Sequence, residues 1–389
     1  MRHGAVASLA GGSPEDNRWR EPAKNFYGWL AKNEEHFRNR KSMSEIAVLY
    51  PQSTIAFYRS EGASERKLNG SNIDPEDHLQ GLYYSLLEGR FIFDFVHQEN
   101  LSAATLKPYR ALLIPNAAYL RDSECEAIRQ YVASGGSILA TFETSRYNEW
   151  GDPRSDFALQ DLFGVNCSGD FDSHPIGPAL NSYMHIRQEH PVLNGFAGTT
   201  LLPGPEFRVP VALRKNESLQ LSVVPQYPSA LPELAYPRER ETNEPAAVFR
   251  QVGASRVVYF PGDVDRTAWR SGNPDFTHLI GNAVRWLLAG KEASVSVEGK
   301  GMTEIFAWRT EPGIAIHILN YTNPNMTRSL VRELYPIGPL HVKVDIPEGQ
   351  KIASVRALRF GQSLVFKRAG SQIQFDIPTI EDYEVIALT

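Results

Sequence analysis

One segment of the chain gathers the residue types that bind sugars. It spans residues 260–275, FPGDVDRTAWRSGNPD, and follows an apolar run that is typical of a strand. Carboxylates and guanidinium groups can form hydrogen bonds with hydroxyl groups, and an indole can stack on the face of a sugar ring. We therefore consider five candidate substrate-binding residues: Asp263, Asp265, Arg266, Trp269 and Arg270.

The same segment allows two other interpretations. The aspartates and arginines can form an ion-pair network that fixes the loop and caps the following helix, which is a common structural arrangement. Asp263 and Asp265 could also act as a catalytic acid and base, but residues two apart share a face only on a strand. Because we expect a loop here, their spacing does not give the separation of the carboxylates. We therefore assign no catalytic residue.

Other catalytic and binding motifs are missing. A nucleophile elbow needs a glycine two residues before and two residues after the serine or cysteine. Residues 143–147, after the expected strand, contain no glycine and no cysteine. Ser145 is therefore interpreted as a loop serine or a helix cap. Cys125 lies on the apolar face of an expected helix and Cys167 in a turn, so neither is expected to be reactive. No zinc-type histidine pattern and no phosphate-binding glycine pattern occurs, so we predict neither a metal site nor a cofactor.

The composition excludes several classes of protein. The chain has 389 residues and a net charge of −5, which leaves no broad cationic surface for a nucleic acid. No apolar run reaches the roughly 18 residues of a membrane span, and the N-terminus lacks the apolar core of a signal peptide. We expect a cytoplasmic protein that binds neither nucleic acids nor membranes.

Strands and helices alternate from residue 45 onward. Apolar runs typical of strands buried on both faces occur at residues 45–50, 91–96, 111–116, 136–143 and 255–263. Helices are expected after Asp74, near Asp122 and after Asn273, because apolar residues then recur at helical spacing. This alternation predicts a parallel sheet with helices on both faces.

Two regions have a β pattern instead. At about residues 165–250, short β-like segments and several prolines predict an antiparallel insertion with a long irregular loop. From residue 292 to residue 389 no helical pattern remains, and strand patterns separated by turn residues predict a β-sandwich.

The N-terminal segment has too few elements for a domain. Phe26, Trp29, Leu30 and Phe37 share one face of an expected helix, which a short apolar strand precedes. A single strand and a single helix cannot form a core, so we expect this segment to pack elsewhere.

The order of these segments resembles the C-terminal two-thirds of family-42-like β-galactosidases and related glycoside hydrolases. The stretches that carry the resemblance are IAVLYPQST (46–54), HLQGLYYSLLEGRFIFDFV (78–96), YRALLIPNAAYLRDSECEAIRQYVASGGSILATFETS (109–145), RVVYFPGDVDRTAWRSGNPDFTHLIGNAVRWLL (256–288) and HILNYTNPNM with RELYPIGP (317–338). The resemblance implies an α/β fold: a flavodoxin-like, class I glutamine-amidotransferase-like parallel sheet with an antiparallel insertion, followed by an all-β sandwich.

The resemblance also implies three domains. Residues 1–43 would be the remnant of the last βα unit of a TIM barrel, residues 44–291 a trimerisation-type domain with its insertion, and residues 292–389 the sandwich. Hydrolases of this family carry their catalytic glutamates on the barrel, which needs upwards of about 200 residues. We therefore expect the barrel to be mostly missing and carry over no catalytic glutamate. Amidotransferase activity is not implied either, because its cysteine with histidine and glutamate partners is absent.

We therefore predict a non-catalytic portion of a β-galactosidase-like glycoside hydrolase that serves assembly or shapes a substrate site in carbohydrate metabolism. The resemblance implies a homo-oligomer, with a trimer as the family's form, and an oligosaccharide or glycoside as the ligand. Two alternatives stay open. One is a stand-alone carbohydrate-binding or scaffold module, and the other is a self-sufficient hydrolase that uses the 260–275 loop.

Overall fold

The computed structural model describes residues 20–60, 74, 76–169, 182–225, 242–291, 293–323 and 333–389. Within them the chain forms two compact units. We call the first, residues 45–89 and 93–291, the α/β unit. The second, which we call the β unit, contains the described residues up to Ser44, Arg90–Ile92 and the described residues after position 291. The short strand expected before residue 20 lies outside the described residues.

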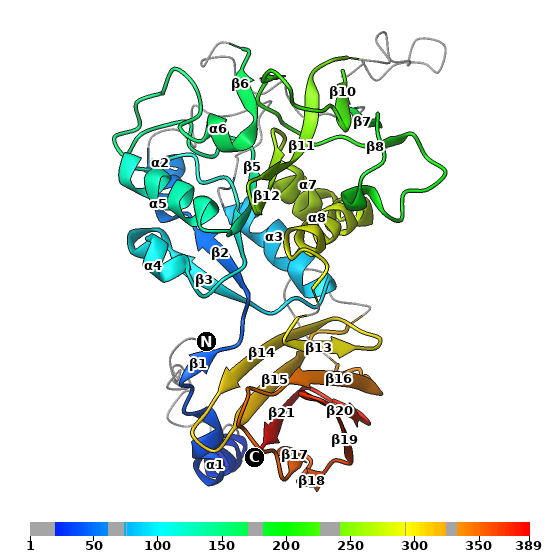
Figure 1. Ribbon diagram of the computed structural model, residues 1–389. Coiled ribbons are helices and arrows are strands. Elements are labelled where there is room, and N and C mark those ends of the chain that lie inside the picture. Colours follow the sequence, from blue (N-terminus) through cyan, green and yellow to red (C-terminus); the bar gives the residue numbers. More distant parts are fainter. Residues whose placement is uncertain are drawn as a thin grey trace. The chain divides into compact units, whose positions relative to one another are not determined.

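A nine-stranded sheet forms the centre of the α/β unit (Figure 1), in the order β3-β2-β4-β5-β12-β11-β10-β7-β8. The first five strands in this order are parallel: β3 (Phe93–His97), β2 (Ile46–Tyr50), β4 (Ala111–Ile114), β5 (Ser137–Thr141) and β12 (Ser255–Phe260). The other four are antiparallel: β11 (Pro245–Val252), β10 (Leu221–Val224), β7 (Tyr183–Ile186) and β8 (Leu201–Pro203). The predicted parallel sheet and antiparallel insertion are confirmed, and the insertion extends the same sheet. A separate antiparallel pair joins β6 (Val165–Cys167) to β9 (Val211–Leu213).

Helices cover both faces of the parallel strands (Figure 1). They are α2 (Gln52–Ser60), α3 (Glu76–Glu88), α4 (Ala103–Leu106), α5 (Asp122–Ala133), α6 (Gln160–Phe163), α7 (Val264–Ser271) and α8 (Pro274–Leu287), with 3-10 turns η2 (Gln98–Asn100) and η3 (Pro191–Leu193). All five residues of β5 are buried, as expected for a strand covered on both sides. Ile128 and Tyr131 of α5 pack against alternate strand residues such as Ile138 and Ala140. The opposite face is covered by α8, which contacts β5 and β12, and by α3 and α7 packed beside it.

Local sequence signals explain where two of these helices begin. The Asn273 side chain accepts a hydrogen bond from the Asp275 amide at 3.0 Å, with Pro274 at the first helical position of α8. Asp74 accepts in the same way from the Glu76 amide at 3.0 Å, ahead of α3.

The expected loop at residues 260–275 is wrong in its central part, because α7 begins at Val264. The helix ends at Ser271, and Gly272 after it has a φ of +65°, the left-handed conformation that glycine adopts readily. The sequence looked like a loop because α7 is rich in polar residues. Three of those residues, Asp265, Arg266 and Thr267, are not solvated but buried.

The β unit contains two antiparallel sheets. The six-stranded sheet has the order β1 (Lys41–Ser42), β14 (Thr303–Arg309), β15 (Ile314–Asn320), β21 (Tyr383–Leu388), β17 (Val355–Ala357) and β18 (Gln362–Ser363). The four-stranded sheet has the order β13 (Val295–Glu298), β16 (Leu340–Asp345), β20 (Gln372–Ile377) and β19 (Phe366–Ala369). One apolar core joins the sheets, with Ile316 and Ile386 from the first and Val342 and Phe375 from the second.

The N-terminal helix packs on the outer side of this unit. It is shorter than predicted: α1 spans Arg20–Lys32, and Phe37 lies in a separate 3-10 turn, η1 (Glu34–Phe37). Asn33 separates them, and its side-chain amide donates to the Trp29 carbonyl at 2.8 Å, an alternative to helix continuation that asparagine favours. Trp29 and Phe37 pack on a cluster that includes Val385, and Trp29 Nε1 donates to the Leu358 carbonyl at 3.2 Å.

Candidate functional site

The candidate residues lie at the carboxyl edge of the parallel strands, where open α/β sheets bind their ligands. Thr141 is the last residue of β5, and Asp263 and Asp265 follow β12 at the start of α7. From the neighbouring helix α3 come Asp77 and His78.

Asp263 fixes the start of α7 to the segment before β9. Its side chain is fully buried, and Oδ1 accepts hydrogen bonds from the Phe207 amide at 2.8 Å and from Thr267 Oγ1 at 3.0 Å. Oδ2 accepts from Arg266 Nη1 at 2.9 Å. Burial raises the pKa of Asp263 to about 6, against the opposing effect of the Arg266 charge. Both carboxylate oxygens are thus engaged by the protein itself.

Asp265 contacts His78, which was not among the residues predicted for the site. His78 Nδ1 lies 2.8 Å from Asp265 Oδ1, and Thr141 Oγ1 donates to Asp265 Oδ2 at 2.7 Å. The Arg266 amide also donates to Asp265 Oδ1, at 2.9 Å. Since a carboxylate only accepts, Nδ1 is the protonated nitrogen of His78 in this pair. The available signal was spacing: His78 lies one helical turn before Leu82, on the buried side of α3.

The two arginines are held in a mostly buried ion-pair cluster. Arg266 Nη1 lies 2.6 Å from Glu206 Oε2 as well as near Asp263. Arg270 reaches the same Glu206 oxygen at 3.5 Å and Asp77 Oδ2 at 3.3 Å. Although burial disfavours its charge, Asp263 and Glu206 raise the pKa of Arg266 above its ordinary value. Glu206 and Asp77 also belong to this ion-pair cluster. They could not be predicted from the sequence, because they are far along the chain from Arg266 and Arg270.

Trp269 is directed toward a neighbouring aromatic ring. It is half-buried and stacks on Tyr84 of α3, with the ring centroids 4.9 Å apart and an interplanar angle of 21°. The structure therefore brings four of the five predicted residues into one network, namely Asp263, Asp265, Arg266 and Arg270. Trp269 lies on the same helix, in the α3–α7 contact.

A second cluster of polar residues lies at the same edge. The Glu143 carboxylate accepts hydrogen bonds from the hydroxyl groups of Tyr58 and Tyr147, and it is 7% exposed. Asn116 Nδ2 donates to the Tyr58 hydroxyl at 3.4 Å. Tyr119 stacks on Tyr147 with ring centroids 4.9 Å apart. These side chains fill the carboxyl edge between β2, β4 and β5, and we call them the tyrosine plug: Tyr58, Tyr119, Tyr147, Asn116 and Glu143.

Thr141 connects the two clusters. Its Oγ1 accepts from the Asn116 amide at 3.0 Å while it donates to Asp265. The backbone is strained here, because Asn116, Phe142 and Ser145 have φ values of 40°, 51° and 68°. Phe142 therefore takes the left-handed turn after a strand that a nucleophile occupies in elbow motifs. Its side chain offers no nucleophilic atom.

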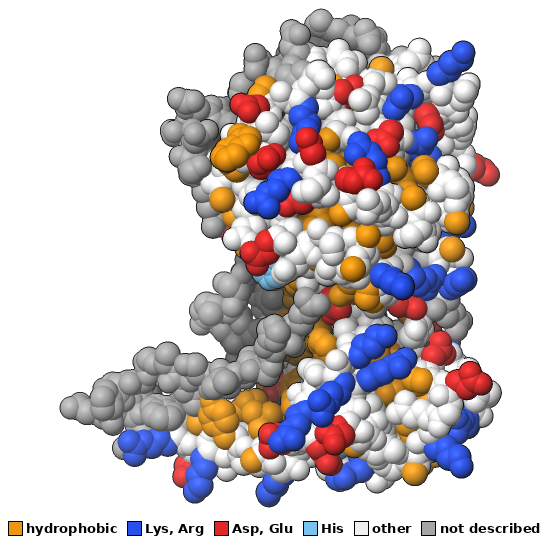
Figure 2. Space-filling view, turned by 60° about the vertical axis from the view of Figure 1, so that its left-hand side comes forward, with side chains coloured by type: hydrophobic (Ala, Val, Ile, Leu, Met, Phe, Trp, Pro, Cys, Tyr) orange, Lys and Arg blue, Asp and Glu red, His pale blue; other side chains and the backbone are white. Residues whose placement is uncertain are grey.

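Neither Ser145 nor Cys125 is available as a nucleophile. Ser145 is fully buried, and its Oγ accepts from the Leu159 amide at 3.1 Å. Burial raises the pKa of the Cys125 thiol to about 12, which keeps it protonated. The described part of the chain holds no group of three or more His, Cys, Asp or Glu side chains suited to a metal ion. Within it no helix is long and apolar enough to cross a membrane. On the face shown in Figure 2, basic and acidic side chains are interspersed over the α/β unit.

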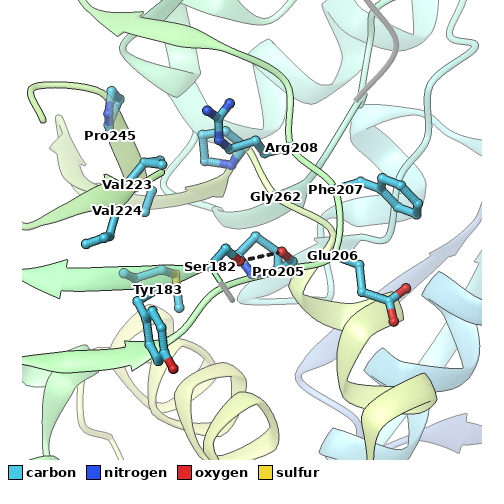
Figure 3. Close-up of a pocket in the computed structure, with 13 residues that line it drawn as sticks. Ser182, Tyr183, Pro205, Glu206, Phe207, Arg208, Val223, Val224, Pro245 and Gly262 are labelled. Atoms are coloured by element: carbon cyan, nitrogen blue, oxygen red, sulfur yellow. Dashed lines mark hydrogen bonds between the residues drawn. The ribbon is translucent and has the colours of Figure 1, made fainter. Parts of the chain in front are cut away.

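A small pocket lies beside the ion-pair cluster, in the antiparallel part of the α/β unit (Figure 3). Its volume is about 40 Å³. Met184 of β7, Val223 and Val224 of β10, and Pro245 of β11 form one side. The segment 205–208 and the turn before Asp263 form the other.

No family model matches the sequence, and no curated protein matches it. Solved structures share its fold. The α-L-fucosidase isoenzyme 2 from Paenibacillus thiaminolyticus has a TM-score of 0.66 and 18% identity, over 93% of this chain and 51% of that one. The β-galactosidase from Bacillus circulans sp. alkalophilus has a TM-score of 0.63 and 14% identity, over 97% and 46%. The β-galactosidase from Rahnella sp. R3 has a TM-score of 0.53 and 13% identity, over 89% and 41%.

This chain therefore spans about half, or less, of the length of these three structures. At such identities the similarity is one of fold. The chain accordingly has the fold of a part of glycoside hydrolase structures: a mixed α/β sheet followed by antiparallel β sheets.

Proposed function

We propose that this chain is a non-catalytic portion of a glycoside hydrolase-like protein in carbohydrate metabolism, which serves assembly or shapes a substrate site. One observation carries the proposal. The carboxylates at the carboxyl edge of the parallel sheet, Asp263, Asp265 and Glu143, are buried and accept hydrogen bonds from this chain's own donors. Glycoside hydrolysis requires two carboxyl groups that face the scissile bond from either side. The Glu143 carboxylate is bonded to Tyr58 and Tyr147 of the tyrosine plug, so it is not presented to such a bond.

The strand order of the sheet supports one domain type. The parallel strands run in the order β3-β2-β4-β5-β12, which is the flavodoxin-like order 2-1-3-4-5 when they are numbered along the chain. This order supports a class I glutamine-amidotransferase-like domain of the trimerisation type. Phe142 at the strained turn after β5 supports a domain of that type without amidotransferase chemistry. The cytoplasmic location and the barrel remnant stay predictions.

The proposal is tested by measuring activity and mass together. We expect the purified chain to give no turnover on a broad panel of aryl glycosides. We expect light scattering to give an oligomer, with three times 43.6 kDa as the mass of the proposed trimer. Robust turnover would overturn the non-catalytic role. A monomer at all concentrations would remove the assembly role and leave the stand-alone carbohydrate-binding or scaffold module.

The self-sufficient hydrolase makes a different prediction for the segment 260–275. If Asp263 and Asp265 were catalytic, Asp263→Ala and Asp265→Ala would abolish an activity while thermal unfolding stayed unchanged. The buried hydrogen bonds of both residues predict the reverse, which is a lower unfolding temperature in each variant.

A further inference from the structure

The pocket beside β10 is lined in part by residues whose backbone conformation is restricted. Three prolines line it, Pro205, Pro245 and Pro261, and each fixes its own backbone φ angle. Gly262 closes the base so tightly that a Cβ atom there would lie 2.3 Å from Pro205 Cγ. The pocket is therefore preformed, which lowers the entropic cost of binding.

The chemistry of the pocket is apolar with one hydrogen-bonding side chain. Figure 3 shows Val223, Val224 and Pro245 on one side and Arg208 above the gap, while the side chains of Glu206 and Phe207 point away. Arg208 Nη1 lies 3.0 Å from Glu244 Oε1, and the Arg208 side chain is still 19% exposed. The guanidinium can thus donate to a ligand while Glu244 balances its charge. Because Glu244 pairs with Arg208, the two side chains together leave no net charge that would favour an anion, and a neutral ligand with an acceptor oxygen fits best.

The size of the pocket limits what enters it. An engineered cavity of roughly 150 Å³ accepts one benzene molecule, and this pocket measures about 40 Å³. A whole sugar ring is too large, whereas a substituent of two non-hydrogen atoms fits. A hydroxymethyl group has that size, with a methylene for the valines and a hydroxyl for Arg208.

We propose that this pocket is a binding site for the exocyclic hydroxymethyl group of a neutral hexopyranose, with the sugar ring at its mouth. The methylene packs against Val223, Val224 and Pro245, and the hydroxyl accepts a hydrogen bond from Arg208. The choice of a sugar among hydroxymethyl compounds rests on the proposed role in carbohydrate metabolism. The preference for a hydroxymethyl group rests on the residues of the pocket and does not depend on that role.

Methionine methyl NMR tests the proposal on the intact chain. The protein has five methionines, and Met184 lines the pocket, whereas Met43 and Met302 belong to the β unit and serve as internal references. The Met184 signal is assigned with Met184→Leu. D-Galactose and D-glucose should shift the Met184 signal in the millimolar range. L-Arabinose and D-xylose have the matching rings without the hydroxymethyl group and should bind about tenfold more weakly, because a methylene contact and a hydrogen bond are lost.

Two variants, Val223→Ile and Arg208→Lys, and two further probes, acetate and glycerol, complete the test. Val223→Ile adds one methylene to the pocket and should abolish the hexose shift while the reference signals stay in place. Arg208→Lys keeps the charge and should weaken hexose binding. Equal shifts from pentoses and hexoses, no Met184 shift from any sugar, or a larger shift from acetate would each overturn the proposal. A shift from glycerol equal to that from the hexoses would reassign the pocket to polyols in general and overturn the sugar assignment.

The outcome of this experiment is independent of the outcome of the test of the proposed function. The NMR titration reports on the Met184 methyl group alone, whereas the proposed function is tested by glycoside turnover and oligomer mass. An inactive oligomer with an unresponsive Met184 refutes only the pocket proposal. A monomer whose Met184 responds to hexoses refutes only the assembly role.

Discussion

His78 Nδ1 and Asp265 Oδ1 form a 2.8 Å contact in which the two side chains are only 1% and 0% exposed. The same pair of atoms occurs in the β unit, where His341 Nδ1 lies 2.8 Å from Asp376 Oδ1 with side chains 41% and 69% exposed. The chain therefore contains one interaction twice at equal distance, once buried and once in solvent.

The buried pair should matter far more for stability than the exposed one. Asp265→Asn removes the charge that orients His78 and leaves a buried imidazole poorly matched, so we expect a loss of about 3 kcal/mol or more in the free energy of unfolding. Asp376→Asn should cost at most about 1 kcal/mol, because exposed pairs contribute little. Urea unfolding of both variants measures the difference. Equal costs would contradict the structural role given to the His78–Asp265 pair.

A glycine sets the distance between α3 and α7. A Cβ atom at Gly81 would lie 1.7 Å from the Asp265 carbonyl oxygen, so Gly81→Ala should push the helices apart and cost about 3 kcal/mol. Gly28 of α1 has nothing within 4 Å of an added Cβ, and Gly28→Ala should be neutral or stabilise the protein by up to about 1 kcal/mol. Thermal unfolding of the two variants makes the comparison. A Gly81→Ala protein that unfolds like the wild type would show that α3 and α7 are not tightly packed.

His317 should make the β unit less stable in acid. Burial lowers the pKa of His317 from 6.5 to about 4, and its Nδ1 lies 2.6 Å from the Tyr383 hydroxyl. The unfolded chain therefore takes up a proton at higher pH than the folded chain. The contribution of His317 to stability should be constant above pH 6.5 and fall between pH 6.5 and 4, by an amount on the order of 3 kcal/mol. In His317→Gln this fall should disappear, as followed by chemical denaturation at several pH values.

Asp263 should produce the opposite slope. Burial raises its pKa from 3.8 to about 6, so the folded chain binds the proton more tightly than the unfolded chain. The contribution of Asp263 to the free energy of unfolding should decrease as pH rises from 3.8 to 6, by an amount on the order of 3 kcal/mol, and then stay constant. The measurement is the stability difference between the wild type and Asp263→Asn across this range. If that difference did not vary with pH, the Asp263 carboxyl would not titrate there.

The elements that depend on local pattern could be predicted from the sequence. The stretch TEIFAWR forms β14, Thr303–Arg309, in the region where strand patterns and turn residues predict a β-sandwich. The parallel strands were recognised in the same way, from short apolar runs such as that of β4. The local sequence pattern does not show which distant residue a charged side chain will contact.

The missed residues at the site are all long-range partners. Glu206 is 60 residues from Arg266, and His78 is 187 residues from Asp265. Without these partners, the pattern of two aspartates and two arginines indicates a solvated loop where the chain forms α7. The strained turn at Phe142 was also missed, because the surrounding packing maintains a positive φ without glycine.

The pairing of β12 has a consequence for how the α/β unit opens. This strand is bonded to β5 on one side and, over Val248–Val252, to β11 on the other, so the inserted strands share a continuous hydrogen-bond ladder with the parallel ones. Amide hydrogens of β11 should therefore exchange with solvent nearly as slowly as those of β5. Exchange should quicken step by step toward β8 at the free edge. The rate of local opening should therefore increase from the central strands of the sheet to its edge at β8. The pocket is lined by strands within this range.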